Sequence, residues 1–590
     1  MMLLAQTSTE TSKALQFPDY MMLVGYFVLM LGIGVYFARF MRGMKMYFTG
    51  GNKIPWWLSG VSFYMSSFSA YAFVVYSGLC FRHGWVGVTL FWVFIPACFI
   101  SAMFFAARWR RARIDSPVEF LENRYNAVVR QLFVWTGLPV GIVDDSLKLI
   151  ATGTIVHVGM GVPLVPSIIA CGVIMVVYTF LGGLWAVTVT DFVQFVILSV
   201  AILIVFPLAL SKVGGFSGLI EGSPEGFFRM TSDQYDWLYI VLLIGLYTIA
   251  CSSTHWYLIQ KYFCVSTEKD AKKAGLLVVC LFIFVPPLIF TPAIAAYQFL
   301  PHDMIDKEVY PRLCAMLLPV GMLGLIIAAM FSATMANLSS HFNVRASVLT
   351  NDVYRRLIRP HAGQRELVHA GRAMTIFVGG LTIVLASWLA NADAAKMFQY
   401  MVTLFGGAVA PMGLPMLLGI TTKRVNALGA AVALITGVTL SILLVYFLGT
   451  EFDFLGIHWR REAFIFAATT LWTVGVMFGV SAMTRRSEDE EKRAAMFHAR
   501  MAVPVGELPE EKAAEAQQDE QVLSPFRVVG ICVICIGAMM ICVQPWIKER
   551  LPMLMNIGLG IGLICLGSLM AWASNRTTAK AAARAANGDQ

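Results

Sequence analysis

Apolar residues in this chain are gathered into long blocks that alternate with short polar segments. Each block approaches the roughly 20 residues that an α-helix needs to cross a bilayer. Only one polar segment between blocks is long, at 484–525, and we expect it to be a cytoplasmic linker. The sequence therefore predicts an all-α polytopic membrane protein. About fifteen membrane-spanning helices are expected, over 18–40, 55–80, 84–107, 129–158, 163–182, 186–211, 236–260, 273–299, 313–343, 368–390, 396–420, 427–449, 463–483, 526–545 and 553–573.

Composition and charge agree with this prediction and indicate an orientation. The chain is 58% hydrophobic and 13% charged, against about 25% charged residues in soluble domains. Its net charge of +9 comes from Lys and Arg residues between the blocks, and no motif for nucleic-acid binding accompanies them. With the N-terminus outside, basic loops such as Arg108–Arg113 and Lys261–Lys273 lie in the cytoplasm, and so does the C-terminus. We expect a protein of the plasma membrane, or of a bacterial inner membrane.

Local motifs give no indication of catalysis, and they predict that some of the membrane helices are interrupted. The catalytic motifs G-x-S-x-G and H-E-x-x-H and the Walker loop are missing from the sequence, so an enzyme is not expected. The segment "GLGIGLICLG" lies in a span, where Gly558 and Gly562 are expected to pack closely against another helix. Ser and Gly residues interrupt the span after residue 50, and three prolines, at 286, 287 and 292, interrupt a later one. Such breaks hold substrate and ion in transporters.

Ionisable residues inside spans are candidate functional residues, because each is costly in hydrocarbon. Asp191 has Thr188 and Gln194 three residues to either side, on one helical face. Oxygen ligands of this kind suit a monovalent cation. An aspartate near the membrane surface, satisfied by water, would give the same pattern.

A second group of charges lies at residues 144–148. Asp144 and Lys148 are four residues apart and are expected to pair across one helical turn. Asp145 then pairs elsewhere, is protonated or, as we expect, faces a water-filled cavity. His255 is a lone histidine in another span, and a satisfied structural role is expected for it before a proton relay.

The segment "MFSATMANLSSHFN", residues 330–343, is rich in hydroxyls and amides although it continues an apolar span. Ser and Thr hydroxyls that bond to their own helix, or small residues that allow close packing, would explain Ser339 and Ser340. They explain Asn337 and Asn343 less well. We therefore expect part of this segment to bind a ligand.

Three segments resemble a known family. They are "YTFLGGLWAVTVTDFVQFVILSV", "SSHFNVRASVLTNDVYRRL" and "TTKRVNALGAAVALITG", and together they resemble the sodium/solute symporter family, which includes sodium-coupled glucose, proline and sialic acid transporters. The resemblance extends from about residue 18 to 483. It implies a LeuT-like fold of two inverted five-helix repeats, with peripheral helices before and after them. The expected divisions are 1–54 (N-terminal segment and first peripheral helix), 55–211 and 236–420 (the repeats), 421–483 (peripheral helices), 484–525 (linker) and 526–590 (two additional C-terminal helices and tail).

The resemblance also implies two sodium sites. The main site combines backbone carbonyls of the broken first core helix, at Met65 and Phe68, with groups of the eighth core helix. There the carbonyl falls at Ala333, and the usual two hydroxyls fall at Ala336 and Asn337. Both hydroxyls are thus missing, although Asn337 has a side-chain oxygen. The second site of some relatives uses an aspartate and two hydroxyls, which match Asp191, Ser339 and Ser340.

The solute site departs further from the relatives. The inner-gate tyrosine and the tenth-helix glutamine of glucose transporters fall near Cys251 and Val402, with Gln399 close to the latter. The arginine of sialic acid transporters falls at Asp144–Asp145. Neither glucose nor sialic acid is supported. The expected solute contacts are Ser67, Ser69, Tyr71, Asp144, Asp145, Lys148, His255 and Gln399.

These observations predict a secondary active symporter that imports a small polar organic solute (sugar, carboxylate or amino-acid-like) with Na⁺ by alternating access. We expect it to act as a monomer in the lipid bilayer. A proton-coupled or uncoupled transporter on the same fold is the alternative, favoured by the missing hydroxyls. A solute sensor is a further alternative, although no signalling domain is evident.

Overall fold

A computed structural model gives the fold, and it describes residues 16–38, 44–114, 116–318, 322–390, 397–509, 511–512 and 525–586. The described part is largely helical. Its one sheet is an antiparallel hairpin of β1 (Glu451–Phe454) and β2 (Ile457–Arg460).

The helices fall in two halves along the chain. The first half contains α1 (Phe17–Ala38), α2 (Met44–Thr49), α3 (Trp56–Ser67), α4 (Ser77–His83), α5 (Val86–Trp92), α6 (Phe94–Ile100), α7 (Ala106–Arg111), α8 (Glu119–Arg124), α9 (Ala127–Met160), α10 (Leu164–Lys212) and α11 (Gly215–Glu221). The second half contains α12 (Trp237–Ile249), α13 (Trp256–Phe263), α14 (Glu268–Ala296), α15 (Val309–Leu317), α16 (Met322–Val348), α17 (Gln364–Leu389), α18 (Met397–Thr421), α19 (Ala427–Phe447), α20 (Arg461–Met483), α21 (Glu488–Ala502), α23 (Pro525–Cys542) and α24 (Arg550–Ala586).

The number of possible membrane spans agrees with the sequence pattern. Thirteen described segments are long and apolar enough to cross a membrane. The bent pair formed by Trp56–Ser67 and Ala72–His83 is a fourteenth candidate, and Leu164–Phe180 is a shorter apolar helix. α10 divides at Gly183, whose φ of +58° and ψ of −168° lie outside the helical region. Its two parts correspond to two of the predicted spans.

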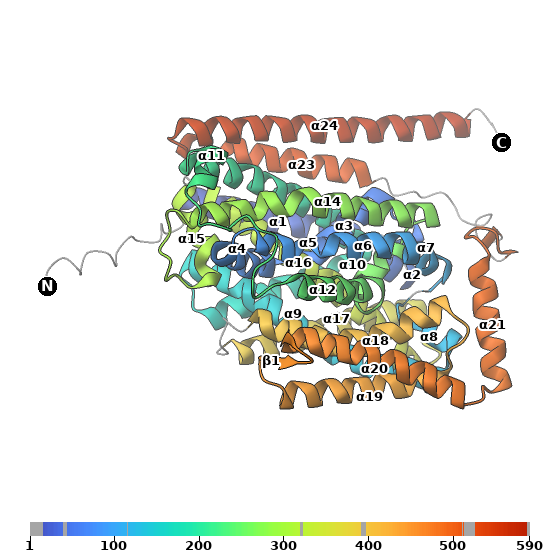
Figure 1. The fold of residues 1–590 in the computed structure, drawn as a ribbon. Helices are drawn as coiled ribbons and strands as arrows, with labels where there is room; N and C mark the ends of the chain where they lie inside the picture. Colours follow the sequence, from blue (N-terminus) through green and yellow to red (C-terminus); the bar gives the residue numbers. More distant parts are fainter. Residues whose placement is uncertain are drawn as a thin grey trace.

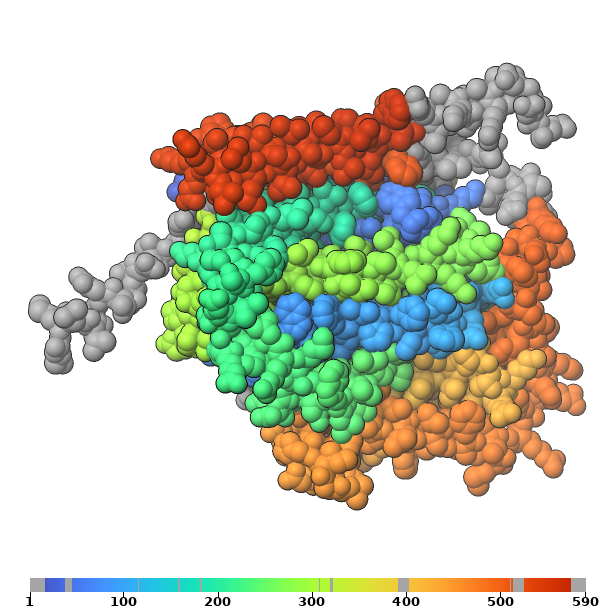
Figure 2. Space-filling model, turned by 45° about the horizontal axis from the view of Figure 1, so that its top comes forward, coloured from blue at the N-terminus to red at the C-terminus, as the bar shows by residue number. Residues whose placement is uncertain are grey.

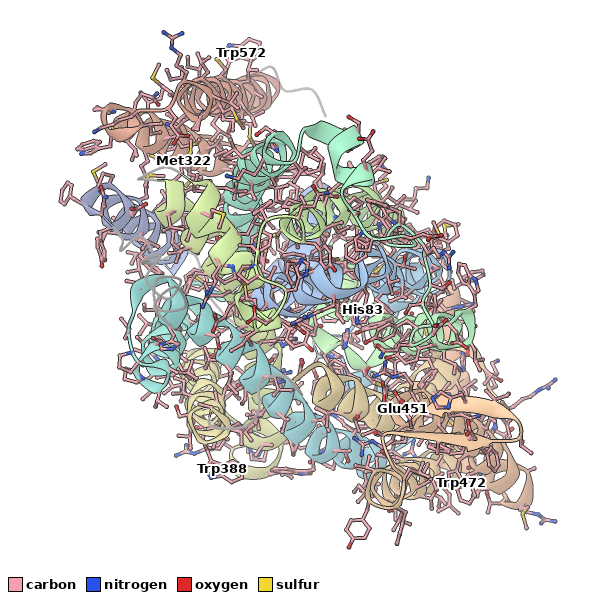
Figure 3. The ribbon with its side chains drawn as sticks, turned by 60° about the vertical axis from the view of Figure 1, so that its left-hand side comes forward. His83, Met322, Trp388, Glu451, Trp472 and Trp572 are labelled. Carbon is pink, nitrogen blue, oxygen red and sulfur yellow. The ribbon has the colours of Figure 1, made fainter. Side chains whose placement is uncertain are left out.

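The long helices run side by side around a buried centre. In Figure 1, α16 lies in the middle, α19 and α20 follow one edge, and α23 and α24 follow the opposite edge. Every residue of α16 is buried. Figure 2 shows the α23–α24 hairpin, in red, as an outer layer. Exposed tryptophans, Trp388, Trp472 and Trp572, lie around the rim of the bundle in Figure 3. The hydroxyls and amides of α16 thus lie inside, and large apolar side chains face outward around the bundle, where membrane helices meet lipid.

Two helices are broken at corresponding places. α3 ends at Ser67, Phe68 is extended, and the chain resumes as a π-helical turn, η2 (Ala72–Tyr76), after a bend of 57°. α12 continues into a second π-helical segment, η4 (Ala250–Thr254), and His255 leaves the helical region before α13 begins. These breaks fall in the first helix of each predicted repeat. The break expected at the three prolines of α14 is wrong, because that helix is continuous. Neighbouring helices can support a proline inside a membrane helix.

Glycines bring α23 and α24 into backbone contact. A Cβ on Gly537 would lie 2.6 Å from the Gly560 carbonyl oxygen, and a Cβ on Gly530 would lie 2.6 Å from that of Gly567. Gly558 has no neighbour of this kind within 4 Å, and neither has Gly562. The sequence analysis thus correctly predicted close packing through glycines of α24. The two glycines it named, Gly558 and Gly562, lie on the exposed face of that helix.

Candidate functional site

Two cavities meet at the centre of the molecule, and His255, Tyr257 and Phe405 line both of them. We call the first the break cavity. It has an empty volume of about 490 Å³ and is also lined by Ser67, Ser69, Tyr71, Ala72, Tyr76, Phe91, Phe94, Lys148 and Tyr247. We call the second the arginine cavity. It has an empty volume of about 510 Å³ and is also lined by Gly137, Val140, Gly141, Asp144, Thr254, Trp256, Val344, Arg345, Ala408, Val409 and Met412.

The break cavity contains five of the predicted solute contacts. Ser67, Ser69 and Tyr71 come from the break after α3, Lys148 from α9 and His255 from the break before α13. The Tyr71 hydroxyl and both ring nitrogens of His255 are buried without a hydrogen-bond partner in the described structure. The satisfied histidine that the sequence led us to expect is therefore not found. Unsatisfied polar groups on an aromatic wall are typical of a site for a small polar ligand.

Asp144 and Lys148 form the predicted ion pair, with 2.7 Å between Asp144 Oδ2 and Lys148 Nζ. Lys148 lines the break cavity, whereas Asp144 lines the arginine cavity. The pair therefore lies between the two cavities. Asp144 Oδ1 has no hydrogen-bond partner among the described residues, so the pair retains an acceptor for a ligand.

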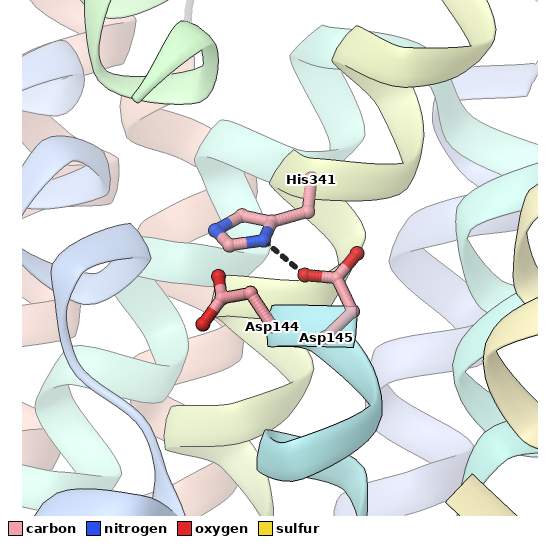
Figure 4. Close-up of side chains that lie close together, drawn as sticks. All are labelled: Asp144, Asp145 and His341. Atoms are coloured by element: carbon pink, nitrogen blue, oxygen red, sulfur yellow. Dashed lines mark hydrogen bonds and ion pairs between the residues drawn. The ribbon is translucent and has the colours of Figure 1, made fainter. Parts of the chain in front are cut away.

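Asp145 does not face a cavity, and that expectation is wrong. Its side chain is fully buried and forms an ion pair with Arg345 of α16. It also forms a hydrogen bond with His341 (Figure 4). Asp144, Asp145 and His341 each offer a ligand atom within 4.8 Å of the others, a spacing that a metal ion could use. Because Lys148 and Arg345 already neutralise the two carboxylates, a divalent ion would add uncompensated buried charge. The cluster is an ion-pair network that joins α9 to α16.

The residues predicted for the main sodium site lie where α16 crosses the break after α3. Met65, Phe68, Ala333 and Ala336 are fully buried, and Asn337 is 1% exposed. The Asn337 amide nitrogen donates to the Ser66 carbonyl oxygen, and its Oδ1 has no hydrogen-bond partner in the described structure. The Ala70 N–H donates to Thr334 Oγ1 over 2.8 Å, a contact that the sequence did not predict. The structure thus places an unpaired side-chain oxygen beside the break.

Asp191 and Ser340, two residues predicted for the second site, both lie near Lys261. The Ser62 hydroxyl of α3 donates to Asp191 Oδ2, and Asp191 Oδ1 has no hydrogen-bond partner among the described residues. Ser340 Oγ lies 2.8 Å from Ser66 Oγ. The Ser339 hydroxyl instead donates to the Ala336 carbonyl oxygen of its own helix, over 3.1 Å.

Lys261 is the residue at this site that the sequence analysis missed. We placed it in a cytoplasmic loop, whereas it lies fully buried in α13. Its Nζ is 3.9 Å from Asp191 Oδ2 and 3.3 Å from Ser340 Oγ. Its apolar neighbours in "WYLIQKYFCV" were a usable signal, because no other charged residue falls in that segment. The remaining predicted contact, Gln399, lies in α18, and its side chain is outside the described residues.

Outside the spans, charged side chains connect α8 to the bundle. The Glu122 carboxylate accepts hydrogen bonds from Arg356 over 2.7 Å and from Arg130 over 2.9 Å. The hydrogen bond from Arg356, together with that from Arg130, lowers the pKa of Glu122 below its usual value. Arg130 also pairs with the buried Asp352. These contacts hold α8 and α9 against η6 (Leu349–Ile358), the π-helical segment that continues α16.

Known proteins share both this sequence pattern and this fold. The model of the sodium:solute symporter family matches residues 47–437. A sodium/glucose cotransporter of Vibrio parahaemolyticus is 27% identical over 475 residues, which cover 74% of this chain and 86% of the relative. A sodium/sialic acid symporter of Proteus mirabilis is 26% identical over 459 residues, which cover 75% and 92%.

Solved structures confirm the LeuT-like fold that the sequence predicted. A sodium-coupled sialic acid symporter in a substrate-bound, outward-open state has a TM-score of 0.70 at 23% identity, covering 80% of this chain and 99% of that one. A nucleobase-cation-symport-1 family transporter in a closed conformation has a TM-score of 0.50 at 13% identity, covering 76% and 98%. The chain belongs to the sodium:solute symporter family, and it is a multi-pass membrane protein that couples the transport of a small-molecule solute to that of Na⁺.

Proposed function

We propose that this protein imports a small polar organic solute, which binds in the break cavity, by alternating access. The main support for this proposal is that residues from the breaks of both helices line the same cavity. Ser67, Ser69 and Tyr71 line it from the first break, and His255 lines it from the second. In transporters of related architecture, discontinuous helices hold the solute and the ion near mid-membrane. Phe91, Phe94 and Phe405 would pack against the solute's apolar parts.

The position of the Asp144–Lys148 pair suggests that this pair contacts the solute as it passes from one cavity to the other. Each member lines a different cavity, and Tyr257 and Phe405 line both. A solute with a charged or strongly polar group would compete with the pair for Lys148 Nζ or for the unpaired Asp144 Oδ1. Asp145 would act indirectly, by fixing α9 against α16 through Arg345.

We assign the sodium ion to the main site. Its ligands would be the carbonyl oxygens of Met65, Phe68 and Ala333, with Asn337 Oδ1 in place of the missing hydroxyls. An unpaired amide oxygen is a suitable ligand for a hard cation. Ala336 can contribute no side-chain oxygen. Because its ligands come from both sides of the break and from α16, a bound ion would hold them together and so favour binding of the solute.

The remaining expectations form part of the same proposal. The repeats would comprise 55–211 and 236–420, and the protein would work as a monomer that converts no substrate chemically. The N-terminus would lie outside and the C-terminus in the cytoplasm, since the basic loops then face inward.

Uptake into proteoliposomes tests the proposal. Candidate solutes are first selected by a thermal-shift screen of sugars, amino acids and carboxylates in NaCl, because a ligand that binds the native state stabilises it. Uptake of the selected solute is then measured with an inward sodium gradient, with equal sodium on both sides, and with a pH gradient alone. We expect accumulation only with the sodium gradient. Equal uptake under all three conditions would refute sodium-driven import, and accumulation driven by pH alone would favour the proton-coupled alternative.

Lys148→Met is the matched test of the cavity. Lys148 is one of the polar residues of the break cavity and has no role in the main ion site. We therefore expect the variant to raise the solute KM at least tenfold, while the sodium concentration for half-maximal uptake changes little. Arg82→Met, which removes a charge from an exposed pair with Asp306, serves as the control.

A further inference from the structure

The second ion site of this protein contains a positive charge of its own. We propose that the Lys261 ammonium is the resident cation of the site around Asp191, so that each transport cycle binds one sodium ion, at the main site. The inference rests on the proposed sodium-coupled function. It changes the expected role of Asp191 and Ser340 from ligands of a transported ion to partners of a tethered one.

The groups around Lys261 Nζ are those that a sodium ion would use. Asp191 Oδ2 lies at 3.9 Å and Ser340 Oγ at 3.3 Å. These oxygens belong to α10 and α16, and Lys261 reaches them from α13. Ser62 and Ser66 of α3 bond to the same two oxygens. The lysine thus takes part in a network that links α3, α10, α13 and α16.

Charge balance makes the lysine and a sodium ion alternatives. Asp191, Lys261 and Ser340 are fully buried, so one carboxylate and one ammonium compensate each other away from water. A sodium ion added beside them would leave a net positive charge in a region of low polarity, which is unfavourable. Removal of the ammonium would instead leave a buried carboxylate that needs a cation.

The backbone of α13 holds the lysine in place. The Lys261 carbonyl oxygen accepts from the Ser59 hydroxyl over 2.7 Å, and the Phe263 carbonyl oxygen accepts from Asn52 Nδ2 over 2.6 Å. Ile54 N–H donates to the Cys264 carbonyl oxygen over 3.2 Å. At and just after Lys261, the backbone is therefore fixed to α3 and to the segment that leads into it, which holds the base of the lysine side chain close to Asp191.

The sodium dependence of uptake tests this inference. The variants are Lys261→Met, which removes the charge but keeps an unbranched side chain, and the double variant Lys261→Met with Asp191→Asn, which removes both charges. We expect a Hill coefficient for sodium of about 1 in the native protein, about 2 in Lys261→Met and about 1 again in the double variant. The ratio of ²²Na⁺ to solute taken up should change in the same way. A native ratio of two, or equal coefficients in the single and double variants, would overturn the inference.

A binding measurement covers the case in which Lys261→Met folds but does not transport. The melting temperature of each purified protein is measured in NaCl and in choline chloride. Because each bound ion stabilises the native state, the sodium-dependent rise in Tm should be larger in Lys261→Met than in the native protein or the double variant. Equal rises in all three would overturn the inference. If a sodium gradient fails to drive uptake by the native protein, the proposed function fails, whereas this comparison still decides the role of Lys261.

Discussion

The pair of Arg345 and Asp145 allows a quantitative test of the buried network. Asp145 is fully buried and Arg345 is 6% exposed. The substitution Arg345→Met removes the guanidinium and leaves the carboxylate with His341 as its bonded neighbour. The substitution therefore leaves the buried Asp145 carboxylate without its cationic partner, while Met keeps most of the apolar packing of the Arg345 side chain.

The expected loss follows from the burial of this pair. Breaking a buried ion pair by removing one partner costs about 3–5 kcal/mol, because the remaining charge is uncompensated. Since His341 still donates to or shares a proton with Asp145, we expect the lower end, about 3 kcal/mol. Each 1.4 kcal/mol is a factor of ten, so the ratio of folded to unfolded protein should fall roughly a hundredfold. The double variant Arg345→Met with Asp145→Asn should lie within about 1 kcal/mol of the native protein.

Equilibrium unfolding of the purified protein in detergent, followed by intrinsic tryptophan fluorescence, measures these differences. The four proteins form a double-mutant cycle, from which the coupling of the two residues is obtained. Arg82→Met is the control, because Arg82 also pairs with an aspartate, Asp306, but the two side chains are 38% and 55% exposed, and the pair should contribute less than about 1 kcal/mol. If Arg345→Met costs no more than this control, or if the double variant is as unstable as the single one, the reasoning about the buried charge is wrong.

Three further predictions address other parts of the molecule. Asn337→Ala removes the proposed side-chain ligand of sodium. It should raise the sodium concentration for half-maximal uptake about 10-fold or more, since a contact to a charged group contributes about 1.5–3 kcal/mol. An unchanged sodium concentration would argue against the main site. Gly567→Leu should separate α24 from α23 and lower Tm by several degrees, whereas Gly558→Leu, at a position with free space, should leave Tm within about one degree. Glu122→Gln should abolish an acid-dependent loss of stability. Because the folded pKa of Glu122 is lowered, its contribution is complete above the ordinary glutamate pKa and is lost as the pH falls through the folded value. Melting curves between pH 7 and 3 should therefore differ less with pH in the variant.

The spans were predictable because the bilayer imposes a length and a composition on each helix. Asp144 and Lys148 were also predictable, since both lie on one helix and their separation fixes their contact. Asp145 was not, because its partners Arg345 and His341 come from a helix about 200 positions away, and spacing along the chain says nothing about that distance.

Lys261 illustrates a second limit. The positive-inside rule counts basic residues near the ends of spans and cannot tell a solvated lysine from one that turns back into the bundle. The helix break at His255 makes the difference, because α13 begins after it as a separate helix and brings Lys261 to within 3.9 Å of Asp191. The prediction that Gly558 and Gly562 pack against another helix failed for a related reason. A glycine-rich segment predicts close packing, but the partner helix determines which face of the segment packs.

The complete burial of α16 has a consequence for how the protein is made. All 27 residues from Met322 to Val348 are covered by other parts of the chain, although the helix carries an arginine. A single arginine opposes insertion into lipid by up to about 2.5–3.5 kcal/mol, the value for the centre of a helix, and Arg345 lies in the last turn of α16. The carboxylates that compensate the charges near α16, Asp145 of α9 and Asp191 of α10, belong to helices that precede it in the chain and are synthesised earlier. We therefore expect α16 to become stable in the membrane only by joining these helices, so that assembly of the protein's centre and insertion of this helix are one event.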